Sequence, residues 1–383
     1  MSNEIAVHWH SAFADEILQR DWEALERNGV CTPFQTRDYV GRMIAGLPAL
    51  AGAEPLFLRL TNAASGDPLL ILPLEAKLHY GARRIDFLDY WVADHQMPIF
   101  DPKQIERLRS DQAVETAMVH AFADFDIFGA RAMPPEWLGV RNPLLSFFPD
   151  LEEVGGSFRL ALDDNLPELM RSKSVYKKAR KNLRRLKDDL GVELVEIVDT
   201  ADLKAAFAAT AEQRAAKFEA SGVQDNFANP EVQAFFLELA QAHVSDGRAL
   251  VQGFRCNGEW VASTFANALG DVMVGQLFSA ADGPWMKFGP GIASILYEIE
   301  WAQKRGLHAY DFGAGLEPYK AQFGATVHPH SKGLRALNTT GQVYLLALKQ
   351  KQNARAAKRF ANSALSNLPF AGSDQNGRAK RSA

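Results

Sequence analysis

Apolar residues alternate between two spacings along this chain. In the longer stretches they recur every three or four residues, which predicts amphipathic helices over 12–27, 37–46, 103–121, 201–220, 230–245 and 290–305. Short apolar runs bounded by Gly, Pro, Asn or Asp predict strands over 56–60, 69–75, 83–88, 125–130, 192–198, 248–255, 259–268, 272–280, 308–312 and 330–338. Asn257-Gly258 between two of these runs is a hairpin signal.

The predicted elements come in the same order twice. Each half reads as two helices, three strands, a helix and a strand, which indicates a mixed α/β (α+β) fold with a duplicated unit. We expect a degenerate unit over 1–156, a second unit over 157–348 and a basic helical tail over 349–383. A single-domain structure in which the strands of 56–88 and 249–280 share one continuous sheet would contradict the duplication.

Between the two halves lies a strongly basic helix, predicted over 166–190. Its segment 171–187 holds nine Lys and Arg residues and no acidic residue. One face is apolar and the opposite face is basic, with Lys173, Lys177, Arg180, Lys181, Arg184 and Lys187. The basic face either covers acidic surface or binds a polyanion such as nucleotide phosphates, RNA or anionic lipid.

Charge and composition narrow the class of protein. The net charge of −4 divides into +7 over 349–383 and therefore −11 over 1–348, so the body as a whole does not resemble a nucleic-acid binder. Two cysteines are too few for a disulfide framework, and the longest apolar runs are too short to span a bilayer. We expect a cytoplasmic protein whose tail ends in disorder from about 366 and offers a possible peripheral membrane contact.

The loop before the helix at 290–305 carries the first candidate chemistry. Lys287, Phe288, Gly289, Pro290 and Gly291 form a short segment with small residues at a helix start. Free amides and the helix dipole favour a phosphate at such a position, and Lys287 adds a positive charge. A tight turn with Pro at the first helical position accounts for the same residues without a ligand.

The region around this loop resembles the GNAT acyltransferase superfamily, and within it the FemAB/CelD-like (BioF2-like) group. The resemblance rests on Gly289-Pro290-Gly291, on Asp311-Phe312-Gly313 and on the YKAQFG run at 319–324, and it is best over 165–325. Thr32-Pro33-Phe34-Gln35 resembles an N-terminal motif of the same group. Met286 departs from the family pattern, which has Gln or Arg there. The resemblance implies tandem GNAT-like units and an acyl-CoA pyrophosphate bound by residues 287–291.

Three residues are candidates for catalysis. Asp311 at the end of its strand either accepts a proton from an attacking amine or accepts hydrogen bonds from the amides that follow it. Lys320 either stabilises an oxyanion or a phosphate or is an ordinary surface lysine, and in tRNA-dependent members of the group a lysine of this motif is implicated in transfer. Tyr319 is a candidate proton donor to a leaving thiolate.

Candidate substrate-binding residues are Arg214, Gln276 and the basic-face residues Lys177, Lys181 and Arg184. Arg214 resembles a cleft-facing arginine of the group, although a surface salt bridge also accounts for it. The His328-Pro329-His330 pair lacks cysteine or acidic neighbours in sequence, so we expect no metal.

The sequence leaves three functions open. The first is transfer of an acyl group, most often acetyl, from acyl-CoA to an amine of a cell-envelope or polysaccharide precursor. The second is aminoacyl transfer from tRNA, as in peptidoglycan-bridge members of the group, with the basic helix holding RNA. The third is a catalytically silent binding module in polysaccharide assembly. A small or nucleotide-linked acceptor is favoured over tRNA, because the rest of the body is acidic.

Overall fold

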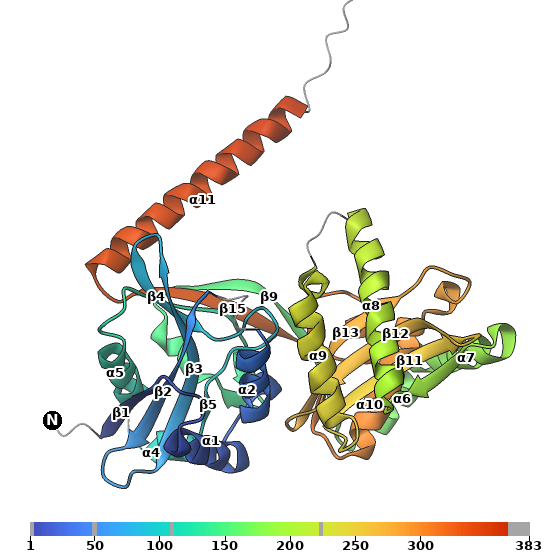
Figure 1. Cartoon of the computed structure of the whole chain (residues 1–383), viewed down its shortest axis with the longest axis horizontal. Helices are drawn as coiled ribbons and strands as arrows, with labels where there is room; N and C mark the ends of the chain where they lie inside the picture. Colours follow the sequence, from blue (N-terminus) through green and yellow to red (C-terminus); the bar gives the residue numbers. More distant parts are fainter. Residues whose placement is uncertain (1–3, 48–51, 108–110, 222–224, 367–383) are drawn as a thin grey trace, which may run out of the picture.

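A computed structural model describes residues 4–47, 52–107, 111–221 and 225–366 of the chain. Two lobes of sheet and helices lie side by side, and the long helix α11 extends away from the first lobe (Figure 1). We call these lobes the N-half and the C-half. In the described residues no helix is long and apolar enough to cross a membrane.

The N-half contains the first strands and helices of the chain. Its elements are β1 (Ile5–His10), α1 (Glu16–Asn28), η1 (Pro33–Gln35), α2 (Arg37–Gly46), β2 (Glu54–Asn62), β3 (Pro68–His79), β4 (Ala82–Phe87), β5 (Ile99–Phe100), α4 (Pro102–Arg107), α5 (Asp111–Ala121), β6 (Ile127–Met133), β7 (Glu136–Trp137), β8 (Val140–Arg141) and η2 (Pro143–Phe147).

The second part of the chain supplies the C-half and α11. Its elements are β9 (Leu151–Ala161), α6 (Leu166–Ser172), α7 (Ser174–Leu190), β10 (Glu193–Glu196), α8 (Thr200–Ser221), η3 (Asn226–Ala228), α9 (Pro230–His243), β11 (Ala249–Cys256), β12 (Glu259–Asn267), β13 (Val272–Ala280), η4 (Met286–Phe288), α10 (Pro290–Lys304), β14 (Ala309–Ala314), η5 (Lys320–Phe323), β15 (Thr326–Ala336) and α11 (Thr339–Ser366).

Local sequence signals account for many of these boundaries. The Asp15 side chain accepts a hydrogen bond from the Leu18 amide at 2.9 Å and caps α1. Asn229 caps α9 in the same way, with Pro230 at the first helical position. Asn257 and Gly258 both have positive φ, as the type I′ turn between β11 and β12 requires.

The two halves have the same strand order. The N-half order is β1-β2-β3-β4-β6-β15, and the C-half order is β10-β11-β12-β13-β14-β9. In each half one neighbouring pair is parallel, β4 with β6 and β13 with β14. The mixed α/β fold and the tandem arrangement expected from the sequence are therefore confirmed.

The strand that follows each half in sequence pairs with the other half. β15 follows the C-half in sequence but pairs with β6, whereas β9 follows the N-half but pairs with β14. The two exchanged strands also pair with each other, antiparallel, and so join the two lobes.

This exchange corrects the expected boundaries. Strands within 56–88 and 249–280 do belong to one continuous sheet, although each half keeps its own strand order. A division between 156 and 157 cuts through β9, because this strand spans 151–161, and β9 pairs with β14 in the C-half sheet. No single chain position separates the halves, since β15 also crosses back to β6.

The halves also share an apolar core. The Tyr39 ring of α2 packs edge-on against the Phe235 ring of α9, with their centroids 5.3 Å apart, and both side chains are fully buried. One cluster of buried side chains continues from the N-half into helices α8 and α9. Burial of this kind fixes the lobes against each other and forms a fixed junction between them.

Two expectations for helices change in detail. The basic helix predicted over 166–190 is two helices, α6 and α7, with Lys173 in extended conformation between them. The tail predicted from 349 begins earlier, because α11 starts at Thr339. The disorder expected from about 366 falls almost wholly on 367–383, which lie outside the described residues.

Candidate functional site

The C-half sheet opens between β13 and β14. Their parallel pairing covers 272–274 and 309–311 and then stops, while β13 continues to Ala280. Among the described strands none pairs with that side of β13 beyond Val274. The backbone groups along this edge are therefore available to an extended ligand.

Gly275 and Gly313 are required at the opening. A Cβ on Gly313 would lie 2.2 Å from the Gly275 carbonyl oxygen, and Gly313 has φ of +71°. A Cβ on Gly275 would lie 2.8 Å from Tyr310 Oη. The two strands approach at this point as closely as their backbones allow.

Beneath the opening lies a buried acid pair that the sequence did not point to. Tyr310 Oη donates a hydrogen bond to Glu298 Oε2 on α10, and Gln252 Nε2 donates to Glu298 Oε1 at 3.1 Å. Burial raises the pKa of both Glu298 and Tyr310. Glu298 is 3% exposed, so this pair forms the floor of the opening.

The predicted phosphate loop lies at the start of α10. Gly289 is in the left-handed region, with φ of +58°, and α10 begins at Pro290. A Cβ on Gly291 would lie 2.9 Å from the Phe278 ring of β13, so the loop lies beside the open edge of that strand. Phe288 is buried, and Lys287 Nζ lies 4.9 Å from its ring centroid.

The basic helix α7 flanks this loop. The Arg185 guanidinium lies 4.6 Å from the centroid of the Phe288 ring. Lys177, Lys181 and Arg184 form an exposed stripe on the side of α7 away from its buried residues. The structure thus brings the basic helix and the loop together, although each is far from the other in sequence.

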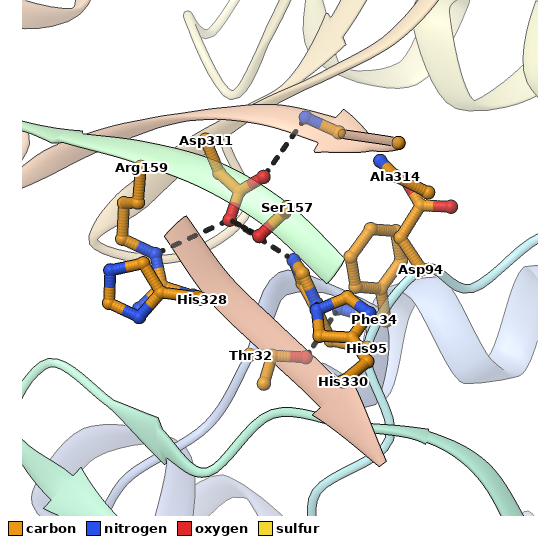
Figure 2. Close-up of polar contacts among 12 residues, drawn as sticks. Thr32, Phe34, Asp94, His95, Ser157, Arg159, Asp311, Ala314, His328 and His330 are labelled. Atoms are coloured by element: carbon orange, nitrogen blue, oxygen red, sulfur yellow. Dashed lines mark hydrogen bonds and ion pairs between the residues drawn. The ribbon is translucent and has the colours of Figure 1, made fainter. Parts of the chain in front are cut away.

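Asp311 lies at the centre of a buried polar network between the halves (Figure 2). Its Oδ2 accepts a hydrogen bond from Ser157 Oγ at 2.9 Å and lies 3.3 Å from both Arg159 Nε and His95 Nε2. Its Oδ1 accepts a hydrogen bond from the Gly313 amide at 2.9 Å. Burial alone would raise the pKa of Asp311, but these partners lower it well below the usual range.

This geometry argues against the expected role of Asp311 as a proton acceptor. The side chain is completely buried, and a carboxylate with a strongly lowered pKa is a weak base. The alternative stated from the sequence, a carboxylate that accepts a hydrogen bond from the following amides, agrees with the Gly313 contact. The contacts of Asp311 join β14 to β9 and to the N-half residue His95.

Sequence analysis did not identify the partners of Asp311. They come from 95, 157 and 159, and His95 Nδ1 lies 3.1 Å from His330 Nε2. The Thr32–Gln35 motif also belongs here, because Gln35 Nε2 donates to the His95 carbonyl oxygen at 2.8 Å. Two local signals pointed to this cluster, that motif and the His328-Pro329-His330 pair, but the residues that surround Asp311 lie far apart along the chain.

Lys320 is 3% exposed and holds the turn after β14. Its Nζ donates to the carbonyl oxygens of Gly313, Ala314 and Gly315 at 3.0–3.2 Å and lies 2.9 Å from Glu317 Oε2. It is therefore not a surface lysine. These four acceptors leave its ammonium group no free hydrogen for an oxyanion.

Tyr319 remains accessible, with 37% of its surface exposed. Burial of part of the side chain raises the pKa of Tyr319 to about 12. The phenol is therefore protonated at neutral pH, as a proton donor must be.

Arg214 and Gln276, the other two predicted substrate-binding residues, lie in different places and have different partners. Arg214 makes a bidentate ion pair with Asp225 at 2.7 and 2.8 Å, as the salt-bridge alternative expected, and its Nη1 lies 3.3 Å from the Phe278 carbonyl oxygen. Gln276 lies at the junction of the halves, where its Nε2 donates to Tyr39 Oη at 3.3 Å. Gln276 Oε1 is buried without a hydrogen-bond partner among the described residues.

A family-model match falls on the part of the chain that contains the opening between β13 and β14. Residues 173–321 match the family model of the acetyltransferase (GNAT) domain. No curated protein matches the sequence.

Solved structures resemble nearly the whole chain. FemX has a TM-score of 0.55 at 13% identity, covering 85% of this chain and 96% of that chain. L-PGS from Bacillus licheniformis has a TM-score of 0.50 at 12% identity, covering 86% and 96%. A conserved protein of unknown function from Bacteroides thetaiotaomicron VPI-5482 has a TM-score of 0.51 at 12% identity, covering 87% and 100%.

At these identities the structural likenesses show the fold, which extends over both halves, while the family match concerns the C-half. Together they confirm the resemblance stated from the sequence. Residues 173–321 therefore match the GNAT acetyltransferase domain, and over both halves the chain has the fold of the FemX structure.

Proposed function

We propose that the protein transfers an acyl group from acyl-CoA to an amine, and that the acceptor is a precursor of the cell envelope or of a polysaccharide. The observation that carries the donor assignment is the opening between β13 and β14, with the start of α10 beside it. The C-half, where this opening lies, is also the part that matches the acetyltransferase family.

The two features suit the two ends of an acyl-CoA. The first-turn amides of α10 have no acceptor within the helix and favour the pyrophosphate, to which Lys287 adds a charge. The free edge of β13 offers backbone hydrogen bonds to the amide groups of the pantetheine chain. The thioester then lies near Gly275, where β13 and β14 separate.

Substitution of Gly291 tests the donor site. Gly291→Asp should weaken acetyl-CoA binding at least tenfold, because a carboxylate at the helix start repels the pyrophosphate and the new Cβ crowds Phe278. Isothermal titration calorimetry measures the affinity. Gly291→Ala adds the Cβ without the charge and should lose much less. Equal affinity of wild type and a folded Gly291→Asp variant would remove this loop from the site.

A second candidate is aminoacyl transfer from tRNA, favoured by the exposed basic stripe of α7. Replacing Lys177, Lys181 and Arg184 together with Gln removes three charges and keeps the buried face of the helix. If tRNA binds there, the slope of log affinity against log salt concentration should become shallower by about 2 to 3 in this variant. If the stripe instead contacts a nucleotide-linked substrate, which we favour, affinity for CoA or a nucleotide sugar should fall, most at low salt.

A charge-matched control separates local contact from net charge. Lys349, Lys351 and Arg355 on α11 are equally exposed, and their replacement by Gln changes the net charge by the same amount. Unchanged affinity and salt dependence in the α7 variant would make the stripe a solvated surface, with a stability change of no more than about 0.5 kcal/mol per site.

A further inference from the structure

The loop that follows β4 carries N-half residues across to the C-half. Within this loop, 88–98, Tyr90 and Trp91 both have positive φ, at 42° and 63°. The Trp91 carbonyl oxygen accepts a hydrogen bond from Asn226 Nδ2 of η3 at 2.9 Å. Left-handed backbone at two consecutive bulky residues is costly and persists only where the surrounding contacts hold it. The loop is thus held in place against the C-half.

Asp94 is the residue that this loop places at the end of β14. Its Oδ2 accepts a hydrogen bond from the Ala314 amide nitrogen at 3.4 Å (Figure 2). The same oxygen would lie 3.6 Å from a Cβ added to Gly313. The other carboxylate oxygen of Asp94 has no hydrogen-bond partner in the part of the chain that the structure describes. Asp94 is only partly buried, unlike Asp311, so one oxygen is available to a substrate.

Gly313 lies between Asp94 and the opening of the C-half sheet. Gly313 lies directly against the Gly275 carbonyl, at the point where β13 and β14 separate. Asp94 therefore faces the place at which the proposed donor would present its thioester. Tyr39 interacts electrostatically with Asp94 and accepts a hydrogen bond from Gln276 Nε2 at 3.3 Å. The buried Gln276 Oε1 has no partner among the described residues.

We propose that Asp94 binds the acceptor amine and takes its proton, so that the N-half supplies the base for a reaction in the C-half. This inference rests on the proposed acyl-CoA donor. The amine nitrogen forms a bond to the thioester carbonyl carbon, and its proton passes to Asp94. The C–S bond then breaks with its electron pair on sulfur, and the thiolate takes the proton from Asp94. Amine and thioester become amide and thiol, and the carboxylate is regenerated.

The surroundings of Asp94 make its carboxylate a stronger base than an ordinary aspartate. Burial raises its pKa, and the nearby Asp311 carboxylate adds to the rise, whereas His95 and Arg131 oppose it. Tyr39 also interacts with it. Because the base must be deprotonated, kcat/KM should increase as pH rises through the pKa of Asp94.

The kinetic test compares Asp94→Asn with wild type, using acetyl-CoA and glucosamine as the acceptor probe and measuring released CoA thiol. We expect kcat to fall 10²- to 10⁴-fold, the rising limb of the pH profile to disappear, and Asp94→Glu to recover part of the rate. Acetyl-CoA affinity by calorimetry should stay within about threefold. Asp164→Asn, an exposed carboxylate remote in sequence from the site, is the matched control.

The outcomes separate this inference from the proposed function. Wild type that fails to bind acetyl-CoA overturns the donor assignment itself. Wild type that binds and turns over, with an Asp94→Asn variant of equal rate and equal pH profile, overturns the role of Asp94 alone. An Asp94→Asn variant that loses acetyl-CoA binding to the same extent as activity likewise assigns Asp94 to structure.

A labelling experiment decides the case in which glucosamine is not an acceptor. Carbodiimide and glycinamide couple to accessible carboxyl groups, and peptide mass spectrometry locates the products. Asp94 should be labelled and Asp311 should not, and acetyl-CoA should protect Asp94. Absence of labelling at Asp94, or labelling that acetyl-CoA leaves unchanged, would overturn the proposal.

Discussion

Asp311→Asn should lower the free energy of unfolding by about 3 to 5 kcal/mol, because it leaves the buried Arg159 guanidinium without its counter-charge. Arg159 is 5% exposed and His95 is completely buried, and both lie 3.3 Å from Asp311 Oδ2. The amide also accepts hydrogen bonds less strongly than the carboxylate from Ser157 and the Gly313 backbone. Urea unfolding followed by circular dichroism measures the change.

The pH dependence of stability gives a second readout for Asp311. Its pKa in the folded protein is lowered, so its contribution is fully present above the ordinary carboxyl pKa of about 3.9 and is lost as pH falls below that value. Asp311→Asn should therefore show its full deficit at pH 7 and a smaller one in acid. The exposed Asp188→Asn is the control, and a deficit under 1 kcal/mol at pH 7 would contradict the anchoring role.

Lys320→Met should also destabilise the protein, by about 2 to 4 kcal/mol, and lower activity as a consequence. The methionine fills a similar volume but leaves three carbonyl oxygens and Glu317 without their donor. The turn over 313–315, which positions β14 at the opening of the sheet, would then lose its support. Thermal unfolding and acetyl-CoA turnover are to be measured on the same samples.

The comparison of the two readouts separates structural from catalytic roles for Lys320. Lys320→Arg keeps the charge and should recover part of the stability, although its larger head does not fit the three carbonyls equally well. A Lys320→Met variant with the unfolding temperature of wild type and no turnover would instead return this lysine to direct participation in transfer.

The sequence predicted the local structure of this protein far better than its long-range contacts. Turn and cap residues such as Asn229 and Asn257-Gly258 act within a few positions, so they mark element boundaries reliably. β9 was missed because its sequence, LEEVGGSFRLA, contains two acidic residues and two glycines among its first six positions. It becomes a strand because β14 and β15 flank it.

In the candidate site, too, the sequence predicted local features better than long-range contacts. The loop at 287–291 and Asp311 were visible because their residue types stand next to a helix start and a strand end. The role of Asp311 depends on Ser157, Arg159 and His95, more than 150 residues away in sequence. No local pattern links such positions, and only the packing of the two halves brings them together.

The exchange of β9 and β15 has a consequence for how the chain folds as it is synthesised. The strand that completes the N-half sheet, β15, leaves the ribosome only after almost the entire C-half. Until then the edge of β6 has no partner, and such an edge is prone to pair with a neighbouring chain. The tandem resembles a domain-swapped dimer whose two subunits are fused, and its N-half sheet is completed only after the C-half has been synthesised.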